Sequence, residues 1–354
     1  MKTTLSILAL LATYATCSVY QIPLDTSVYI YNAAQVNPQF AQLISLSNHS
    51  TICANISLGT PAQYFNVLLD TTSSSFWIAG VGYEGTPGLT TYNSTASTTY
   101  YSSPGSLNDL DNILGNGSPF IAEGNMAMDT LQIGNFTYYD TVFGEANFVQ
   151  NPVPGIDGIL GLGFPQIDLC SGVSSMEQIL RDGDFDNVSF SLFYSSTSQS
   201  YLFLGGIDST YATSDFVYFS LIGNGMWGFI GSLYYGTVPL AKNVEFIVDT
   251  TSPGLIYLPQ LAANNYAEAS GLFMGTTYEN DVLHWLRPLL ILVGGQEINL
   301  SASDYMTCSD NLCQTVLIPQ KDRENSVILG TGFLELFYTH FDYENNRIGF
   351  SPRA

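Results

Sequence analysis

The chain has 354 residues, more than one hydrophobic core usually supports, so we expect two domains. Its 8 Lys and Arg against 30 Asp and Glu give a net charge of −22 at pH 7, which argues against nucleic acids and anionic membranes as partners. The hydrophobic content of 46% excludes a mostly disordered chain, and 23 Tyr, 21 Phe and 32 Gly favour strands joined by tight turns, so the predicted fold class is all-β.

The acidic composition suits a low pH. In acid the carboxylates become neutral while few cations remain to repel one another, so the folded chain tolerates acid well. Charge alone leaves two interpretations open. The chain either works in an acidic lumen or an acidic secretion, or its acidic residues serve only solubility.

The first residues have the features of a secretory signal peptide. Lys2 precedes an apolar run over residues 5–12, and Ala15-Thr16-Cys17 offers small residues for cleavage, so residues 1–17 are predicted to be removed. An uncleaved membrane anchor is the alternative, but the apolar run is too short to span a bilayer. We expect a soluble product without a membrane anchor, either extracellular or in an acidic lumen such as the lysosome.

Glycosylation signals and cysteines agree with secretion. After cleavage four cysteines remain, an even number that suggests two disulfides in an oxidising compartment. The pairing we expect is Cys308 with Cys313 and Cys53 with Cys170, although four cysteines allow three connectivities and buried free thiols are the other possibility. The acceptor sequons for N-glycosylation are Asn48, Asn55, Asn93, Asn116, Asn135, Asn187 and Asn299.

The first half is predicted to be built mainly of strands. Residues 18–48 form a polar lead-in, which is either a short pro-segment or an N-terminal strand with its approach. Residues 53–58 alternate, turn at Gly59-Thr60-Pro61 and continue into a strand over 64–70. A loop-rich region over 80–117 and a hairpin over 120–143 follow, and we expect this lobe to span residues 49–208.

Two helices interrupt the predicted strands. The first covers residues 174–182 with Ser175 as its cap, and the second covers 260–270. Strands are predicted over 201–206 and 289–293, and a closing strand ends at Phe350. The second lobe is expected to span residues 209–354.

An internal repeat suggests that the two lobes are related. Residues 67–73 and 246–252 are both an apolar run, then one aspartate, then small hydroxyl residues. An Ile-Leu-Gly-x-Gly-Phe segment follows each copy at a similar distance, at residues 159–164 and 328–333. Repeated order at similar spacing indicates a duplication.

The repeat delivers one carboxylate to the end of one buried strand in each lobe, at Asp70 and Asp249. Two carboxylates brought together by lobe symmetry cannot both ionise cheaply, so they share a proton over a range of pH. One can then act as a base while the other acts as an acid. A lone aspartate at a strand end would instead be a turn or cap residue.

In these motifs the chain resembles the pepsin-like aspartic peptidases. The resemblance implies a bilobed β enzyme with a cleft between two β-barrel-like lobes, a peptide or protein substrate in that cleft, a monomer, and no metal or other cofactor. The matching segments are residues 56–61, Asp70-Thr71-Thr72-Ser73-Ser74, Trp77, 156–163, Asp249-Thr250-Thr251-Ser252, 328–330, 341–342 and 345–350.

The resemblance also implies a role for each matching residue. Asp70 and Asp249 would hold a water, one activating it and the other protonating the developing oxyanion. Thr71 and Thr250 match the threonines that lock the two loops together. Ser73 and Ser252 match hydroxyls that donate to the outer carboxylate oxygens, although as turn-stabilising hydroxyls they would have no catalytic part.

Several positions depart from the family pattern. Thr72 and Thr251 replace glycines, which adds β-branched bulk at the most crowded part of the site. Leu114 lies in the segment where the family has a tyrosine, so Trp77 has lost its usual hydroxyl partner. Thr331 replaces a common acidic residue, and residues 18–48 contain none of the basic residues found in the pro-segments of the family.

Two functions follow from these matches and departures. The first is an aspartic endopeptidase that acts at acidic pH through Asp70 and Asp249, whose retention favours it. The second is a catalytically impaired secreted homologue that binds peptides or a protein partner in the cleft, which the altered positions Thr72, Thr251 and Leu114 favour.

Overall fold

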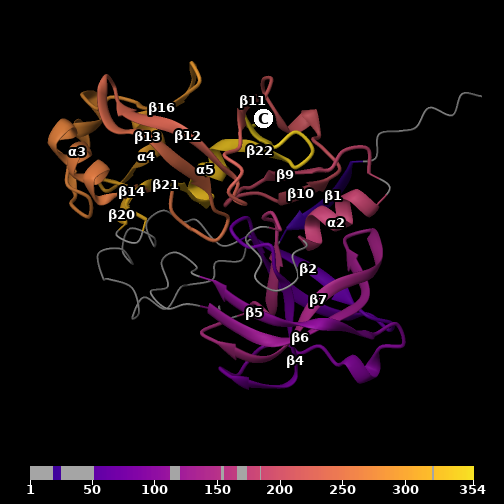
Figure 1. Cartoon of the computed structure of the whole chain (residues 1–354). Helices are drawn as coiled ribbons and strands as arrows, with labels where there is room; N and C mark the ends of the chain where they lie inside the picture. The colour runs from indigo at the N-terminus through magenta and orange to yellow at the C-terminus, as the bar shows by residue number, and fades with distance from the viewer. Residues whose placement is uncertain are drawn as a thin grey trace, which may run out of the picture.

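The structure is a computed structural model of an all-β molecule with two halves that each contain a large sheet (Figure 1). The first half carries the magenta and violet strands and the second half the orange and yellow ones. The described residues are 19–24, 52–111, 120–152, 155–165, 174–183, 185–320 and 323–354.

The first half is built on a seven-stranded sheet in the order β2-β3-β8-β4-β7-β6-β5. An additional pairing between β2 and β6 closes six of these strands into a barrel and leaves β5 at the edge. The strands are β2 Cys53–Leu58, β3 Gln63–Asp70, β4 Phe76–Gly85, β5 Tyr101–Asp111, β6 Phe120–Ile133, β7 Phe136–Gln150 and β8 Gly158–Gly161.

The second half has its own seven-stranded sheet, in the order β17-β16-β12-β13-β21-β14-β20, and a small three-stranded sheet β15-β19-β18. The strands are β12 Gly228–Tyr235, β13 Val238–Val248, β14 Ile256–Pro259, β15 Tyr278–Glu279, β16 Leu289–Val293, β17 Gln296–Leu300, β18 Met306–Ser309, β19 Leu312–Thr315, β20 Leu317–Gln320 and β21 Ser326–Leu329. Cys308 and Cys313 are joined by a disulfide in the small sheet, the pairing expected for them.

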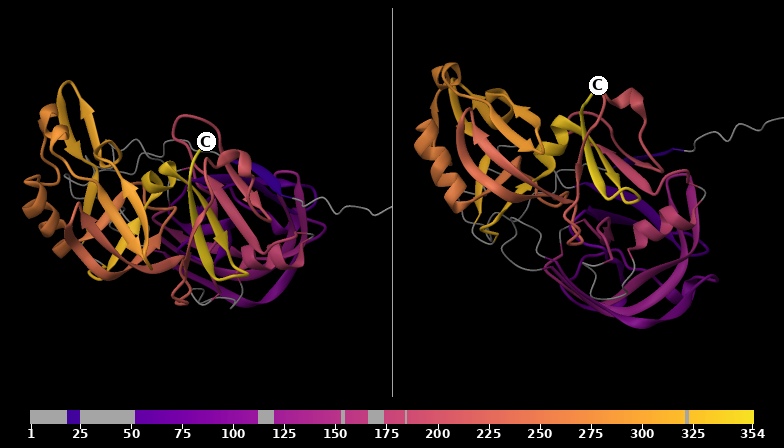
Figure 2. Two further views of the ribbon diagram at one scale, coloured as in Figure 1. Left: turned by 90° about the horizontal axis from the view of Figure 1, so that it is seen from above. Right: turned by 45° about the horizontal axis from the view of Figure 1, so that its top comes forward.

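A six-stranded sheet combines strands from both halves, in the order β1-β10-β9-β22-β23-β11 (Figure 2). Residues 20–24, within the predicted lead-in, form its first edge strand and pair with β10. The strands are β1 Tyr20–Leu24, β9 Ser189–Phe193, β10 Ser200–Leu204, β11 Val217–Ser220, β22 Phe337–Asp342 and β23 Arg347–Pro352.

Short helices cover parts of the sheets. The helix predicted over 260–270 is present with those bounds and ends at Gly271, whose φ of 74° suits glycine. For the other predicted helix the cap is Ser174 and not Ser175, because the Ser174 hydroxyl accepts from the Glu177 amide. The helices are α2 Ser175–Asp182, α3 Gln260–Ser270, α4 Ala302–Tyr305 and α5 Thr331–Leu336, with 3-10 turns η1 Ser94–Ala96, η2 Ser209–Tyr211 and η3 Asn280–His284.

The prediction of a loop-rich region over residues 80–117 was wrong over residues 80–85 and 101–111. Strand β4 continues to Gly85, and β5 occupies Tyr101–Asp111. β5 pairs with β6 and lies at the edge of its sheet, and it carries the three serines and one asparagine of a largely exposed strand. This polar composition is what made the segment resemble a loop.

The repeat in the sequence corresponds to a repeat in topology. In the first half β3 runs parallel to β8, which is antiparallel to β4. In the second half β13 runs parallel to β21, which is antiparallel to β14. The Ile-Leu-Gly segments supply β8 and β21, so each lies beside the strand that leads to an aspartate.

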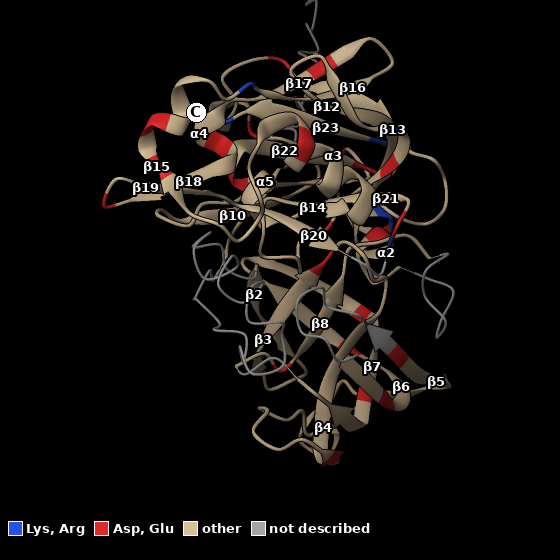
Figure 3. Cartoon of the chain, turned by 90° about the vertical axis from the view of Figure 1, so that its left-hand side faces the viewer, with Lys and Arg blue, Asp and Glu red and all other residues tan. Residues whose placement is uncertain are grey.

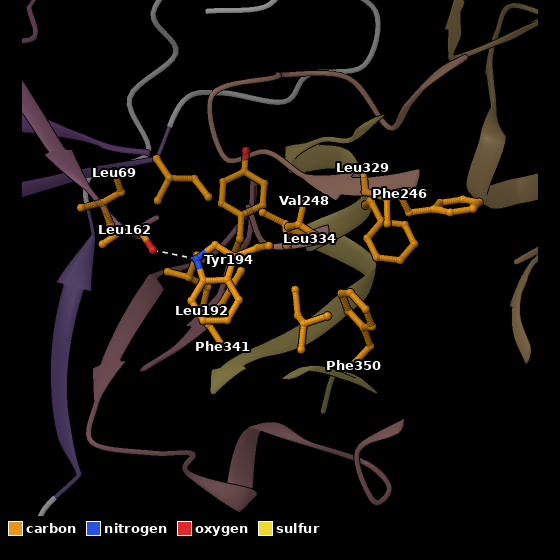
Figure 4. Close-up of a cluster of buried hydrophobic side chains, with 14 of the residues drawn as sticks. Leu69, Leu162, Leu192, Tyr194, Phe246, Val248, Leu329, Leu334, Phe341 and Phe350 are labelled. Carbon is orange, nitrogen blue, oxygen red and sulfur yellow. Dashed lines mark hydrogen bonds between the residues drawn. The ribbon is translucent and has the colours of Figure 1, made fainter. Parts of the chain in front are cut away.

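A continuous apolar core lies under these sheets. Trp227 is fully buried, stands edge-on to Phe190 and Phe341 from the six-stranded sheet, and donates to the carbonyl of Leu162 at 2.7 Å. Leu162, Leu192 and Phe341 lie in this cluster of buried side chains (Figure 4). The core therefore joins the six-stranded sheet to the loop that follows β8. None of the helices in the described part of the chain has the length and apolar character needed to cross a lipid bilayer.

Candidate active site

Each predicted aspartate lies where its buried strand ends. Asp70 is the last residue of β3, and Asp249 directly follows β13. The apolar residues before them are fully or almost fully buried, which holds the ends of the two strands in place. Both carboxylates are themselves almost completely buried, with exposed fractions of 0% for Asp70 and 2% for Asp249.

The two loops that follow the aspartates are bonded to each other through Thr71 and Thr250. Each threonine amide donates to the hydroxyl of the other, at 3.0 Å and 3.1 Å. Each hydroxyl in turn donates across the same interface, Thr71 to the carbonyl of Val248 at 2.8 Å and Thr250 to the carbonyl of Leu69 at 2.6 Å. The arrangement is symmetric and brings both predicted locking residues into one network between the halves.

Thr72 and Thr251, the residues that replace glycine, contact the carboxylates directly. The Thr72 hydroxyl donates to Asp70 Oδ1 at 2.7 Å, and the Thr251 hydroxyl donates to Asp249 Oδ1 at 2.6 Å. The backbone amides of the same two threonines donate to the same oxygens, at 2.7 Å and 2.8 Å. Each Oδ1 therefore has two donors from its own loop, one of which a glycine would not provide.

The remaining carboxylate oxygens differ between the halves. Asp249 Oδ2 accepts from the Ser252 hydroxyl at 2.7 Å, the contact expected for that serine. Ser73 makes a different contact, because its hydroxyl accepts from the Ser75 amide at 3.1 Å. Asp70 Oδ2 is buried and has no hydrogen-bond partner among the described residues. The pair thus has one fully bonded carboxylate and one with an oxygen left open.

The electrostatics of the pair follow from burial and proximity. Burial raises the pKa of Asp249, and the negative charge of Asp70 raises it further. Hydrogen bonds from Thr251 and Ser252 act in the opposite direction, because they stabilise the ionised form. The net result is a carboxyl group that retains its proton to higher pH than an exposed aspartate.

Glycines allow the Ile-Leu-Gly segments to pass close to the loops that follow Asp70 and Asp249. A Cβ at Gly161 would lie 2.5 Å from the carbonyl carbon of Ser74, and one at Gly330 would collide with the carbonyl oxygens of Ser252 and Gly254. The amide of Leu162 donates to the Asp70 carbonyl at 2.6 Å, within this close packing. The two segments hold the backbone of the loops from below.

Trp77 has a partner that sequence reasoning missed. Its indole Nε1 donates to Asp109 Oδ2 at 2.8 Å, and both side chains are buried. Asp109 comes from β5, which lies in the segment predicted to be rich in loops. The signal was present in the alternation of Leu107 and Asp109, which are both buried and lie two residues apart on one face of the strand.

The remaining predicted residues are Leu114, the cysteines Cys53 and Cys170, and Thr331. Leu114 lies outside the described residues, and so does Cys170, the expected partner of Cys53. Cys53 is buried in the first half beside Leu68 and Trp77. Thr331 is fully buried at the start of α5, and its hydroxyl has no hydrogen-bond partner in the described ranges.

The chemistry available is that of two buried carboxylates with hydroxyl and amide donors. Within the part of the chain that the structure describes, no group of three or more His, Cys, Asp or Glu side chains is placed to hold a metal ion. Paired carboxylates of this kind can exchange a proton with a bound water and with a substrate carbonyl.

Comparison with known proteins agrees with this geometry. The family model for eukaryotic aspartyl protease matches residues 52–353. Gastricsin from Oryctolagus cuniculus is 30% identical over 325 residues, covering 84% of this chain and 80% of that protein. Pepsin A from Sus scrofa is 28% identical over 347 residues, covering 91% of this chain and 88% of that protein. With its pepsin-like bilobed β fold, the chain belongs to the eukaryotic aspartyl protease family.

Proposed function

We propose that this protein is an aspartic endopeptidase that hydrolyses peptide bonds of proteins at acidic pH. The observation that carries the proposal is the pair of buried carboxylates, Asp70 and Asp249, at the ends of equivalent strands in loops cross-linked by Thr71 and Thr250. Membership of the family supports the reaction class.

The proposed reaction starts with Asp249 protonated and Asp70 ionised. Asp249 carries the proton because its pKa is raised by burial and by the charge of Asp70. Asp70 takes a proton from a water held between the two groups, and the water oxygen attacks the peptide carbonyl carbon. Asp249 protonates the carbonyl oxygen, which gives a neutral gem-diol. The C–N bond then breaks as the amine nitrogen receives a proton from Asp70 and the gem-diol returns one to Asp249.

The proposed substrate, location and oligomeric state follow from the sequence and the family. The substrate is a peptide or protein bound as an extended segment between the lobes, residues 49–208 and 209–354. The chain acts as a secreted glycoprotein or in an acidic lumen, after removal of residues 1–17, and works as a monomer. The sequons, the signal-like N-terminus and the excess of acidic residues support this setting.

Activity on a denatured protein tests the proposal. The purified mature chain is expected to cleave such a substrate at about pH 3 to 5, where a carboxylate pair shares one proton, and a statine-type transition-state mimic should block the cleavage. Asp70→Asn should reduce the rate by several orders of magnitude. Unchanged activity in this variant would show that the assignment of Asp70 is wrong.

A second candidate is a homologue that binds peptides or a protein partner in the cleft without efficient cleavage. Thr72 and Thr251 favour it, because each places a β-branched side chain beside a carboxylate where glycine would leave space. A displacement of about 1 Å at the reacting atoms costs roughly 100-fold in rate. This candidate predicts that the double variant Thr72→Gly with Thr251→Gly cleaves substrates that the parent only binds. Efficient cleavage by the parent chain would exclude it.

A further inference from the structure

A cavity lies on the six-stranded sheet, on the face opposite the Trp227 core. Its volume is about 190 Å³, and Val19 and Ile207 form its apolar part. Ser189, His340, Asp342 and Arg347 also line it. None of these residues belongs to the candidate active site.

The pairing of the strands places the polar residues on one face. Ser189 on β9 pairs with Asp342 on β22, and Asp342 pairs with Arg347 on β23. Directly paired residues of antiparallel strands point to the same side, and so do residues two apart, which adds His340. The intervening Phe341 points to the other face, where it stands edge-on to Trp227.

Two of the lining side chains are buried and carry an atom without a partner. Ser189 is 1% exposed and His340 is 7% exposed. Neither the Ser189 hydroxyl nor His340 Nε2 has a hydrogen-bond partner among the described residues. Buried polar atoms are almost always bonded, so two of them at one cavity indicate that something polar belongs there.

These groups act as hydrogen-bond donors. The Tyr218 hydroxyl lies 2.8 Å from His340 Nδ1, and burial raises the pKa of Tyr218, so the hydroxyl keeps its proton and can donate it to Nδ1. In that tautomer His340 Nε2 carries a hydrogen. The Arg347 guanidinium lies over the Tyr218 ring with its carbon 4.0 Å from the centroid and adds a positive charge.

The carboxylate that lines the cavity already accepts four hydrogen bonds, and the other polar lining residues include Asn187 and Asn345. Asp342 Oδ1 accepts from the Asn345 amide and side chain at 3.1 Å each, and Oδ2 accepts from the Asn345 side chain at 2.9 Å and from Arg347 Nε at 2.7 Å. A ligand therefore meets the donors of Ser189, His340 and Arg347 and a carboxylate that is already paired with Arg347, which favours an anion over a cation.

We propose that this cavity binds a small monocarboxylate anion, whose oxygens accept hydrogen bonds from Ser189, His340 and Arg347 while a short aliphatic group contacts Val19 and Ile207. The cavity volume matches a molecule of a few carbon atoms. The site is separate from the candidate active site, and this proposal does not depend on the proposed peptidase activity.

Binding should be linked to protonation of His340. The charged groups facing this ring are Asp342 on its own strand and Arg347 on β23, while Tyr218 on β11 and the serines of β9 are neutral. Burial lowers the pKa of His340 to about 4. A carboxylate beside Nε2 favours the imidazolium, so the pKa of His340 rises when the site fills and protons are taken up near pH 5.

The experiment is a calorimetric titration of the purified chain at about pH 5, in a buffer without carboxylates and at constant ionic strength. Isobutyrate is expected to bind saturably with proton uptake, and isobutyramide, which has the same shape without the charge, should bind at least about 10-fold more weakly. Absence of saturation by isobutyrate up to about 100 mM would overturn the proposal, as would equal binding of the amide.

A pair of serine variants locates the binding. Ser189→Ala removes one donor and should weaken isobutyrate binding by about 5- to 10-fold. It removes a hydroxyl that has no described partner, so the variant should fold at least as stably as the parent. Ser191→Ala is the matched control, because Ser191 lies two residues along the same strand and its hydroxyl donates to the Gly206 carbonyl at 2.8 Å. Parent-like affinity in Ser189→Ala, or equal losses in both variants, would refute the site.

Discussion

Asp249 accepts hydrogen bonds from the Thr251 amide, the Thr251 hydroxyl and the Ser252 hydroxyl, and these lower a pKa that burial and Asp70 raise. Thr251→Val keeps the bulk of the side chain and removes the hydroxyl. Since a hydrogen bond to a charged group contributes about 1.5 to 3 kcal/mol, the pKa of Asp249 should rise by about one unit or more. Carbon-13 NMR titration of the labelled aspartates measures this directly, whether or not the chain cleaves peptides.

Thr251→Ser is the control for that measurement, because it keeps the hydroxyl and removes only the methyl group. In this variant the pKa of Asp249 should stay close to its value in the parent chain. Equal shifts in Thr251→Val and Thr251→Ser would mean that the methyl group, and not the hydrogen bond, sets the ionisation. The comparison therefore separates the two consequences of having threonine where the family has glycine.

Asp249 also makes stability depend on pH. Because its folded-state pKa is raised, the unfolded chain loses this proton first as the pH rises, so stability is highest below the unfolded pKa of about 3.8 and falls as pH rises through the folded value. Each unit by which the folded-state pKa exceeds the unfolded one lowers the free energy of unfolding at neutral pH by about 1.4 kcal/mol. Asp249→Asn should therefore raise the free energy of unfolding at pH 7 relative to the parent, and do so less at pH 3. Urea denaturation at both pH values provides the test; an equal change at both would contradict it.

At the scale of elements, β4 and β5 are connected by the hydrogen bond between Trp77 and Asp109. Asp109→Ala leaves the buried indole N–H unbonded and should destabilise the fold by about 1 to 3 kcal/mol. Asp109→Asn keeps an acceptor of the same shape and should cost clearly less. Denaturant unfolding of both variants measures the difference, and equal losses would show that the charge of Asp109 matters more than its acceptor oxygen.

The elements that were predicted well are those with a strong local pattern. The strand over 53–58 and the helix over 260–270 have these bounds in the structure, because alternation and a terminal glycine are local signals. β5 was missed because an exposed edge strand has a polar composition. Partners far apart in the chain are not visible in spacing either. Asp109, 32 residues from Trp77, becomes its partner only through the tertiary fold.

The candidate site was anticipated to a similar degree. The repeat alone indicated two facing carboxylates, while the roles of Thr71 and Thr250 came from the family resemblance. The threonines at 72 and 251 were considered only as added bulk, although their hydroxyls donate to the carboxylates. Rotamer choice decides whether a hydroxyl turns toward a neighbouring carboxylate, and the identity of the residue does not reveal it.

At the scale of the whole molecule, charges of one sign dominate, with 30 acidic residues against 8 Lys and Arg. Acidic residues appear over both halves and basic ones are few (Figure 3). The salt bridges found among the described residues are Arg181 with Glu177 and Arg347 with Asp342. Most of the 30 acidic side chains therefore lack a cationic partner and repel one another at neutral pH. This repulsion destabilises the compact state and disappears as the carboxylates become protonated.

Salt should therefore stabilise the protein at neutral pH and do little in acid. Raising NaCl from about 20 mM to about 500 mM shortens the screening length from roughly 20 Å to roughly 4 Å, which weakens repulsion between surface carboxylates. We expect the melting temperature at pH 7 to rise by about 3 °C or more, and the rise at pH 3.5 to be much smaller because most carboxylates are then neutral. Differential scanning calorimetry at the two pH values measures both shifts, with an uncharged osmolyte as the control for general exclusion from the surface. A salt response of the same size at pH 3.5 would show that self-repulsion of the carboxylates does not set the salt dependence of stability.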